Sequence, residues 1–368
     1  MINIDIHTKV IGSDTSIFVA RPGRNYRFFQ RFVDHNFVGP DLPGLDLPPF
    51  TEIDDVEDLE ERVKRSFELR RYFTRGERDI DYPSLDLASY EDTATSRSTA
   101  QIVRVVRAYF GGMKKGDIVI VPPAPFRSMA QIGELTTEPN DVRSLNIEMY
   151  EGRPLSGRYV RWLASIEKAK LPPQTLDALQ KPSPLISLIK PAWPAIFRRA
   201  YGSYMTSDEY GARFEVTSDR FQTNDDFLIQ AFFNFVAANF DRVEKEASVY
   251  DFYNGAFSAE DVAPDLYTNV NSPGGISLKS AVAIPIVIAT MLNIAITVGP
   301  DAHAAAVNDQ ITFGNSQAPP NDPCTALVRR QVVTQLTLLG YDKWAIACQN
   351  ARAAAVRTGI SSSVEVKP

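Results

Sequence analysis

An uncharged run from Ala281 to Gly299 constrains the fold of this chain more than any other sequence feature. A helix of this length approaches the roughly 20 residues needed to cross a bilayer. Pro285, Asn293 and Thr297 lower the hydrophobicity of the run, and a central Asn is costly in lipid. The run therefore predicts either the buried central helix of a folded unit or a membrane-spanning helix. Its short length favours the buried helix.

The residues around this run bear on where the protein resides. Lys279 precedes the run and the next Lys or Arg is Arg329, so a spanning helix would keep its N-terminal side in the cytosol. The N-terminal sequence lacks the basic segment, apolar segment and small-residue cleavage site of a secretory signal. We therefore expect a cytoplasmic protein, with the alternative of an inner-membrane protein whose N-terminal module faces the cytosol.

The composition is that of a folded chain with room for two or three domains. Of its 368 residues, 44% are hydrophobic and 23% are charged. The formal net charge of -6 argues against a protein that coats nucleic acid, although a local basic surface can exist within an acidic chain. The two cysteines and three histidines do not have the spacing of zinc ligands.

Four segments in the first half of the chain have the pattern of β-strands. Apolar, β-branched runs predict strands at Ser16–Arg21, Asp117–Val121, Met129–Leu135 and Tyr159–Ile166. These strands can pair their backbone groups and bury their apolar faces by sharing one barrel. An acidic start, regularly spaced apolar residues and a basic end predict a helix over residues 54–73, between the first two strands.

Five short motifs in this half occur in the order of a known module. They are RPGRN at Arg21–Asn25, the aromatic segment Phe28–Phe32, GDIVIVP at Gly116–Pro122, QIGELT at Gln131–Thr136 and RWLASI at Arg161–Ile166. Residues from about 14 to 195 thereby resemble the PUA-like/EVE-like N-terminal modules of prokaryotic restriction and defence proteins, among them the Mrr-type proteins. Where that pattern often has a tryptophan after the second strand, this chain has FVGPDLPG.

The resemblance implies a small barrel that holds a base or a nucleotide against an aromatic side chain. Trp162 is the first candidate for the stacking residue, although strand alternation also allows it to belong to the barrel core. Arg21 and Arg24 flank a Pro-Gly turn, where they could bind phosphate or remain solvated. Arg161 and Phe18 complete the expected ligand site.

The second half of the chain reads as mostly helical. An acidic start and an apolar, aromatic body predict a buried helix after Asn224. Further apolar spacing predicts two helices that turn at Gly340 into an antiparallel hairpin. Such a hairpin could bring Cys324 near Cys348, either as a disulfide outside the cytosol or as two small apolar side chains within it.

No pattern of catalytic residues supports an enzyme. His303 is the only histidine after residue 200, the Asp…Glu-x-Lys signature of Mrr-type nucleases is missing there, and NSPGGIS lacks the lysine of a P-loop. The sequence identifies no cofactor and no metal site. An enzyme of restriction type with a degenerate or partner-supplied active site remains as an alternative.

These patterns together predict an α+β protein of two modules. Residues 1–195 would form the PUA-like/EVE-like barrel with inserted helices, and residues 201–368 would form a mostly helical effector or assembly module. The leading function is that of a non-enzymatic prokaryotic defence component. Its barrel would recognise a nucleic-acid base or nucleotide signal, and its helical module would act by homo-oligomerisation, through a partner protein of a defence operon, or on a membrane through Ala281 to Gly299. A structural scaffold is the third alternative.

Overall fold

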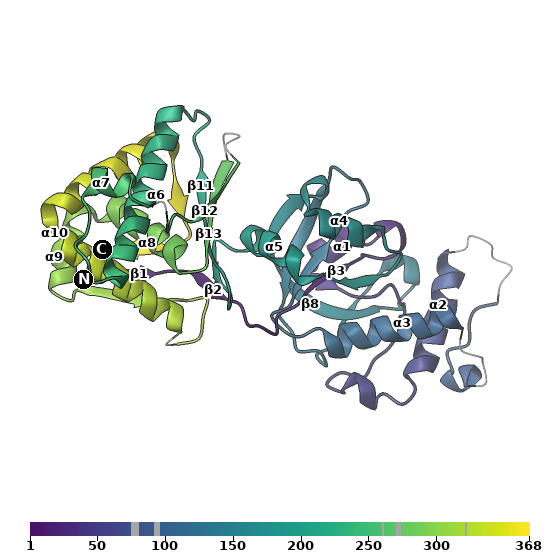
Figure 1. Cartoon of the computed structure of the whole chain (residues 1–368). Helices are drawn as coiled ribbons and strands as arrows, with labels where there is room; N and C mark the ends of the chain where they lie inside the picture. The colour runs from purple at the N-terminus through teal and green to yellow at the C-terminus, as the bar shows by residue number, and fades with distance from the viewer. Residues whose placement is uncertain (75–80, 92–95, 260, 270–273, 321) are drawn as a thin grey trace. The chain divides into compact units, whose positions relative to one another are not determined.

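The chain has a mixed α+β fold made of two compact units (Figure 1). The computed structural model describes residues 1–74, 81–91, 96–259, 261–269, 274–320 and 322–368. One unit is Asp14–Ala200, and the other combines Met1–Ser13 with Tyr201–Pro368. The first residues of the chain therefore belong with its second half, whereas the sequence placed them in the N-terminal module.

The unit Asp14–Ala200 is built on one curved sheet that forms a half-barrel. Within the described residues this sheet has seven strands in the order β4-β8-β6-β5-β3-β9, with β7 beside β8. Strands β3 and β5 are parallel and the other pairs are antiparallel. The strands are β3 (Ile17–Ala20), β4 (Phe37–Val38), β5 (Ile118–Val121), β6 (Met129–Leu135), β7 (Arg143–Leu145), β8 (Leu155–Glu167) and β9 (Leu185–Ser187). The four strands predicted from sequence thus lie in one sheet, as expected.

An irregular pairing between β6 and β8 contributes to the curvature of this sheet. Ile132 lies opposite Ala164 and Gly133 lies opposite Trp162, so Leu163 is an extra residue on β8. Such a bulge bends the longer strand and increases its twist. Gly133 is suited to this position because a Cβ there would lie 2.8 Å from the Trp162 ring.

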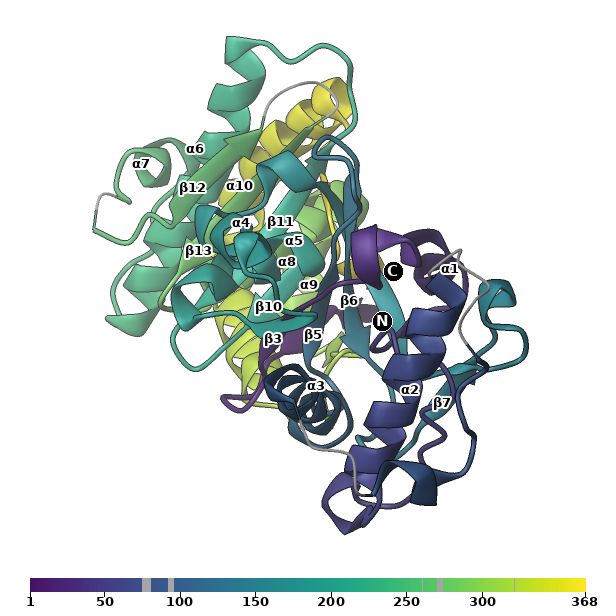
Figure 2. The same cartoon turned by 90° about the vertical axis from the view of Figure 1, so that its right-hand side faces the viewer.

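Helices accompany this sheet on both sides (Figure 2). Every residue of β5 is buried, which explains its unbroken apolar sequence. Val119 and Val121 of β5 share a core with Val105 and Val106 of α3, and alternation turns Ile118 and Ile120 to the opposite face. Helix α4 contacts β3, and α5 contacts β8. The helices are α1 (Phe29–Asp34), α2 (Leu59–Thr74), α3 (Arg97–Arg107), α4 (Pro173–Gln180) and α5 (Trp193–Ala200).

The other unit contains more β-structure than the sequence predicted. Within the described residues, a six-stranded sheet has the order β12-β13-β11-β10-β2 with β15 beside β11, and a three-stranded sheet has the order β14-β1-β16. The strands are β1 (Ile2–Asp5), β2 (Thr8–Val10), β10 (Ser203–Met205), β11 (Tyr210–Val216), β12 (Asp265–Asn269), β13 (Gly274–Ser280), β14 (Ile311–Gly314), β15 (Ser361–Ser362) and β16 (Glu365–Lys367). Strand β1 lies between β14 and β16 and pairs with both, because Ile4 pairs with Phe313 on one side and with Val366 on the other.

The uncharged run forms the central helix of this unit. Helix α8 (Ile284–Thr297) contacts α6, α10 and β11, and Ile288 at its middle is fully buried. In the described part of the chain, no helix combines the length and the apolar character that crossing a membrane requires. The buried-helix prediction is therefore confirmed, and the spanning alternative for Ala281 to Gly299 is wrong. The other helices are α6 (Thr223–Glu244), α7 (Phe252–Ala256), α9 (Ala302–Val307) and α10 (Pro323–Thr358).

The two helices predicted on either side of Gly340 form, but they do not fold back into the antiparallel hairpin. Gly340 has the non-helical angles φ 70° and ψ 171°, and the two helices that make up α10 meet there across a kink. Before the kink Arg330 pairs with Glu244 at the end of α6, and after it Arg357 pairs with Asp225 in the first turn of α6. The chain therefore continues along α6 in one direction through the kink. In an antiparallel hairpin, the second helix would instead run back toward the end of α6 that the first helix contacts.

The two cysteines consequently lie in different parts of α10. Cys324 is in its first turn and Cys348 follows the kink, and both are free thiols that are almost fully buried. Burial raises the pKa of each thiol to about 12. Their role as small apolar core side chains, one of the two alternatives from the sequence, agrees with this arrangement.

Candidate functional site

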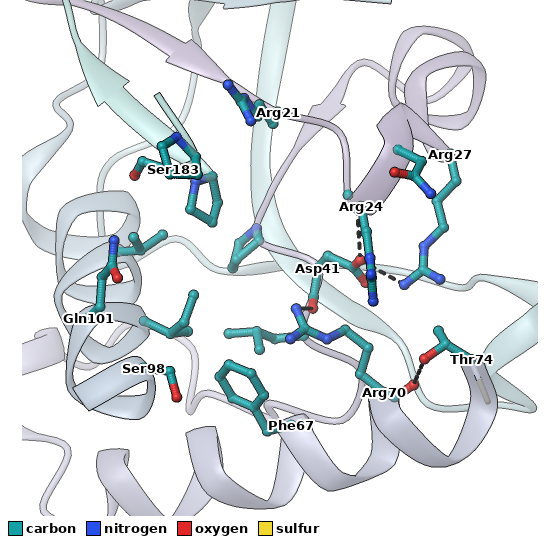
Figure 3. A pocket seen from close by; sticks show the side chains of 18 of the residues that line it. Arg21, Arg24, Arg27, Asp41, Phe67, Arg70, Thr74, Ser98, Gln101 and Ser183 are labelled. Atoms are coloured by element: carbon teal, nitrogen blue, oxygen red, sulfur yellow. Dashed lines mark hydrogen bonds and ion pairs between the residues drawn. The ribbon is translucent and has the colours of Figure 1, made fainter. Parts of the chain in front are cut away.

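A basic cavity of about 430 Å³ lies in the unit Asp14–Ala200. Its walls come from the loop Arg21–Arg27, the segment Pro40–Leu42, the C-terminal half of α2, one face of α3 between Ser98 and Val105, and the segment Pro182–Pro184. Figure 3 shows Ser98 and Gln101 of α3 on one side of this cavity, with Arg24 and Arg70 on the other. The site therefore combines five segments that are separated in sequence.

The loop Arg21–Arg27 has an unusual backbone that shapes one wall. Gly23, Asn25 and Tyr26 all have positive φ angles, of 74°, 56° and 60°. A Cβ at Gly23 would lie 3.2 Å from the Asp41 carboxylate and still closer to Phe28, so this turn requires glycine. Two consecutive non-glycine residues in the left-handed region carry a conformational cost that surrounding contacts must offset.

Asp41 provides the contacts that hold this loop. Its carboxylate accepts hydrogen bonds from Nη2 of Arg27 at 2.7 Å and from the backbone N–H of Arg24 at 3.2 Å. Its main-chain oxygen accepts one from Nη1 of Arg70 at 3.3 Å. The Arg70 guanidinium also lies 4.4 Å from the centre of the Phe67 ring. The carboxylate thereby neutralises one guanidinium of the cavity and orients its neighbours.

Lys168 supports the same loop from the sheet. Its ammonium lies 4.6 Å from the centre of the Tyr26 ring and donates to the main-chain oxygen of Pro123 at 2.9 Å. Burial lowers the pKa of this lysine, and the nearby charge of Arg21 lowers it further. Lys168 is thus a buried support of the loop, and it does not line the cavity.

Arg24 differs from the other cavity arginines in having no partner for its side chain among the described residues. Arg27 and Arg70 are both hydrogen-bonded, and Arg21 donates to the main-chain oxygens of Leu179 and Lys181. The Arg24 side chain is exposed and lines the cavity. The Nε atoms of Arg21 and Arg27 are buried without a hydrogen-bond partner within the described residues. Among the described cavity arginines, Arg24 is therefore the one whose guanidinium is both exposed and without a hydrogen-bond partner.

The charge of the cavity opposes that of the chain. Arginines 21, 24, 27 and 70 line it against a single carboxylate, that of Asp41, while the chain as a whole has a formal net charge of -6. Guanidinium groups bind phosphate and carboxylate oxygens through paired hydrogen bonds. The arrangement is suited to an anion that makes hydrogen bonds at several oxygens.

The part of the cavity lined by α3 and Phe67, which we call its inner part, has a different character. Phe67, Ile102 and Val105 provide apolar surface, and Ser98 and Gln101 provide hydrogen-bonding groups. Ligand sites commonly combine apolar walls with a few polar groups that fix orientation. A planar, polar-edged ring attached to an anionic group would match both parts of the cavity.

The structure brings only two of the five sequence-predicted site residues into this cavity. Arg21 and Arg24 line it. Trp162 is half-buried against the core and its Nε1 donates to the main-chain oxygen of Val33 at 3.0 Å. Arg161 is exposed, and its Nη2 lies 3.5 Å from Oε2 of Glu134. Phe18 packs against the same core as Trp162. These last three residues lie outside the cavity lining.

Sequence reasoning missed Arg27, Asp41, Phe67, Arg70 and Gln101. Arg70 is one of several arginines on α2, and its sequence neighbours do not distinguish it from a solvated helix residue. Gly23 within RPGRN was the one available signal, because a glycine that tolerates close approach often marks a binding turn. Which helix faces that turn could not be deduced from local sequence.

The fold and site together define an α+β protein with a basic cavity in its half-barrel unit. Within the described residues, no group of three or more His, Cys, Asp or Glu side chains is arranged to hold a metal ion. No protein-family model, curated protein or solved structure matches the chain.

Proposed function

We propose that the unit Asp14–Ala200 is a recognition module that binds a phosphorylated nucleotide, or the phosphorylated end of a nucleic-acid strand, in the basic cavity. The observation that carries this proposal is the Arg24 guanidinium, which has no partner among the described residues and lies in a cavity lined by four arginines and one carboxylate. Its backbone N–H is fixed by Asp41, so the residue is held in place while its side chain stays available.

Charge and shape support a nucleotide over a simple anion. A phosphate group would receive charge-assisted hydrogen bonds from Arg24 and Arg70. The attached base would lie in the inner part of the cavity, where Phe67 and Ile102 offer apolar contact and Gln101 offers a hydrogen-bonding edge. An inorganic anion would leave this inner part of the cavity unused.

The wider role that we propose is that of a non-enzymatic prokaryotic defence component. It is supported by the resemblance of residues 14–195 to PUA-like/EVE-like modules and by the shared sheet of β3, β5, β6 and β8. The proposed site differs from the one that the resemblance implies, because Trp162 lies outside the cavity lining and bonds to Val33. The other unit would respond to ligand binding by assembling with copies of this chain or with a partner protein.

The test is calorimetric titration of the full-length protein with the four common nucleoside 5′-monophosphates and their unphosphorylated nucleosides. We expect at least one monophosphate to bind and its nucleoside to bind at least about tenfold more weakly, because a charge-assisted contact is lost. Arg24→Ala should weaken the monophosphate about fivefold to tenfold. Arg31→Ala, at an exposed arginine of α1 outside the cavity lining, is the matched control and should have no effect.

Mass spectrometry of small molecules released from the purified protein gives an independent readout. We expect a phosphorylated compound that the Arg24→Ala protein retains less well than the wild type. Equal binding of nucleosides and monophosphates, or equal losses in the Arg24→Ala and Arg31→Ala proteins, would contradict the proposal.

A further inference from the structure

A second hollow adjoins the basic cavity. It has a volume of about 470 Å³ and shares Arg24, Arg27, Phe67 and Arg70 with the first. It also shares Asn25 and Thr74, and the two residues that line it alone, Glu68 and Arg71, lie on the same part of α2. Arg24 and Arg70 thus lie where the two hollows meet.

The second hollow, which we call the outer hollow, is lined by more charged residues than the inner part of the first cavity. Its additional residues include Glu68 and Arg71, and Nη1 of Arg71 lies 3.7 Å from Oε2 of Glu68. Both side chains are about half exposed, so this ion pair contributes little and an incoming anion can replace Glu68 as the partner of Arg71. The inner part of the first cavity is instead lined by Ile102, Val105 and Gln101, none of which is charged.

The residues that line the two hollows together include more arginines than one phosphate group can contact. Its charged residues are Arg21, Arg24, Arg27, Arg70 and Arg71, with Asp41 and Glu68 as the carboxylates. Asp41 is bound to Arg27, which leaves Arg24, Arg70 and the weakly paired Arg71 along one path. A second anionic group beyond the first would meet Arg71.

We propose that the ligand carries two phosphoryl groups, which deepens and rests on the function proposed above. The base lies in the inner cavity beside Gln101, the first phosphoryl group lies between Arg24 and Arg70, and the second lies in the outer hollow beside Arg71. A nucleoside 5′-diphosphate and a dinucleotide with a 5′-phosphate both present this chemistry. They differ in whether the phosphoryl groups are joined to each other or separated by a ribose.

The experiment compares three ligands with the same base on the full-length protein by calorimetry. For the base that binds best, these are the nucleoside monophosphate, the nucleoside diphosphate and the 5′-phosphorylated dinucleotide. We expect one of the two doubly phosphorylated ligands to bind about tenfold tighter than the monophosphate, because it gains a further charge-assisted contact. The tighter of the two identifies how the phosphoryl groups are linked.

Arg71→Ala separates the outer hollow from the inner cavity. We expect it to reduce affinity for the preferred doubly phosphorylated ligand about fivefold and to leave the monophosphate unchanged. Arg31→Ala should change neither affinity, because it lies outside both hollows. Equal affinity for all three ligands, or an Arg71→Ala loss that is the same for the monophosphate, would overturn this inference while the proposed function stands. Binding of none of them would overturn both.

Discussion

The carboxylate of Asp41 lies 2.7 Å from Nη2 of Arg27, and this pair organises the basic cavity. Asp41 is 7% exposed, and its carboxylate also accepts from the Arg24 backbone and from the hydroxyl of Tyr150. Burial raises the pKa of that hydroxyl, and the charge of Asp41 raises it further. Tyr150 therefore remains a hydrogen-bond donor throughout the physiological pH range.

Asp41→Asn should destabilise the unit Asp14–Ala200 and weaken ligand binding. The amide keeps the shape of the carboxylate but loses the charge that balances Arg27, so we expect a loss of about 1–3 kcal/mol in the free energy of unfolding. Urea denaturation followed by circular dichroism measures this loss. Asp54→Asn, at a 75% exposed side chain, is the control and should change stability by less than about 0.5 kcal/mol. Similar effects of the two substitutions would contradict the role given to Asp41.

Arg158 provides a second test of the same unit, at a site that serves the fold. Its side chain is fully buried and donates to the main-chain oxygens of Tyr109, Met113 and Thr137. Arg158→Ala leaves these oxygens without a donor and opens a cavity, so we expect a loss of about 3 kcal/mol or more in the free energy of unfolding. Arg161→Ala, three residues along β8 at an exposed side chain, should cost less than about 1 kcal/mol. A small effect at Arg158 would show that water or other donors replace it.

Ile288→Arg should prevent the unit that contains α8 from folding. Ile288 is fully buried in this helix, and an unpaired charge there has no solvent and no partner. Val282→Arg, at a 45% exposed residue just before α8, should fold normally. Limited proteolysis with mass spectrometry compares the folding of the two variants. We expect rapid cleavage within residues 201–368 in the Ile288→Arg protein alone. Comparable protease resistance of the two variants would contradict the central position of α8.

The cysteines should be unreactive in the folded protein and should make its stability depend on alkaline pH. Burial raises the pKa of Cys324 and Cys348 from the ordinary 9.0 to about 12. Each thiol has a higher pKa in the folded protein than in the unfolded chain, so the unfolded chain loses these protons first as the pH rises. The free energy of unfolding is therefore unaffected by these groups below pH 9 and decreases as the pH rises from 9 towards 12.

Thiol titration with a chromogenic disulfide measures this difference at pH 8. We expect negligible reaction of the native protein and reaction of both thiols after denaturation in guanidinium. A Cys324→Ala/Cys348→Ala protein should lose less stability than the wild type between pH 9 and pH 11, as measured by urea denaturation. Rapid modification of the native protein would show that the thiols are accessible.

The sequence by itself determined the elements whose signal is local. The β-branched residues of β5 and β6 predicted two strands, and the uncharged run predicted a helix at α8, with burial favoured over a membrane span. The spacing of Val56, Leu59, Val63 and Phe67 within an acidic-to-basic segment likewise predicted α2, where Leu59 and Val63 are buried. Each prediction succeeded because the spacing of apolar residues within a short segment indicates whether its buried face belongs to a strand or to a helix.

Only the tertiary structure decided which distant segments meet. Ile2 and Ile4 pair with Ile311 and Phe313, and nothing in the local pattern of a strand specifies its partner, because any exposed strand edge can complete the backbone hydrogen bonds. The basic cavity depends on the same kind of information. Arg24, Asp41, Arg70 and Gln101 lie in separate segments, and they share a site because sheet order and helix packing place those segments side by side.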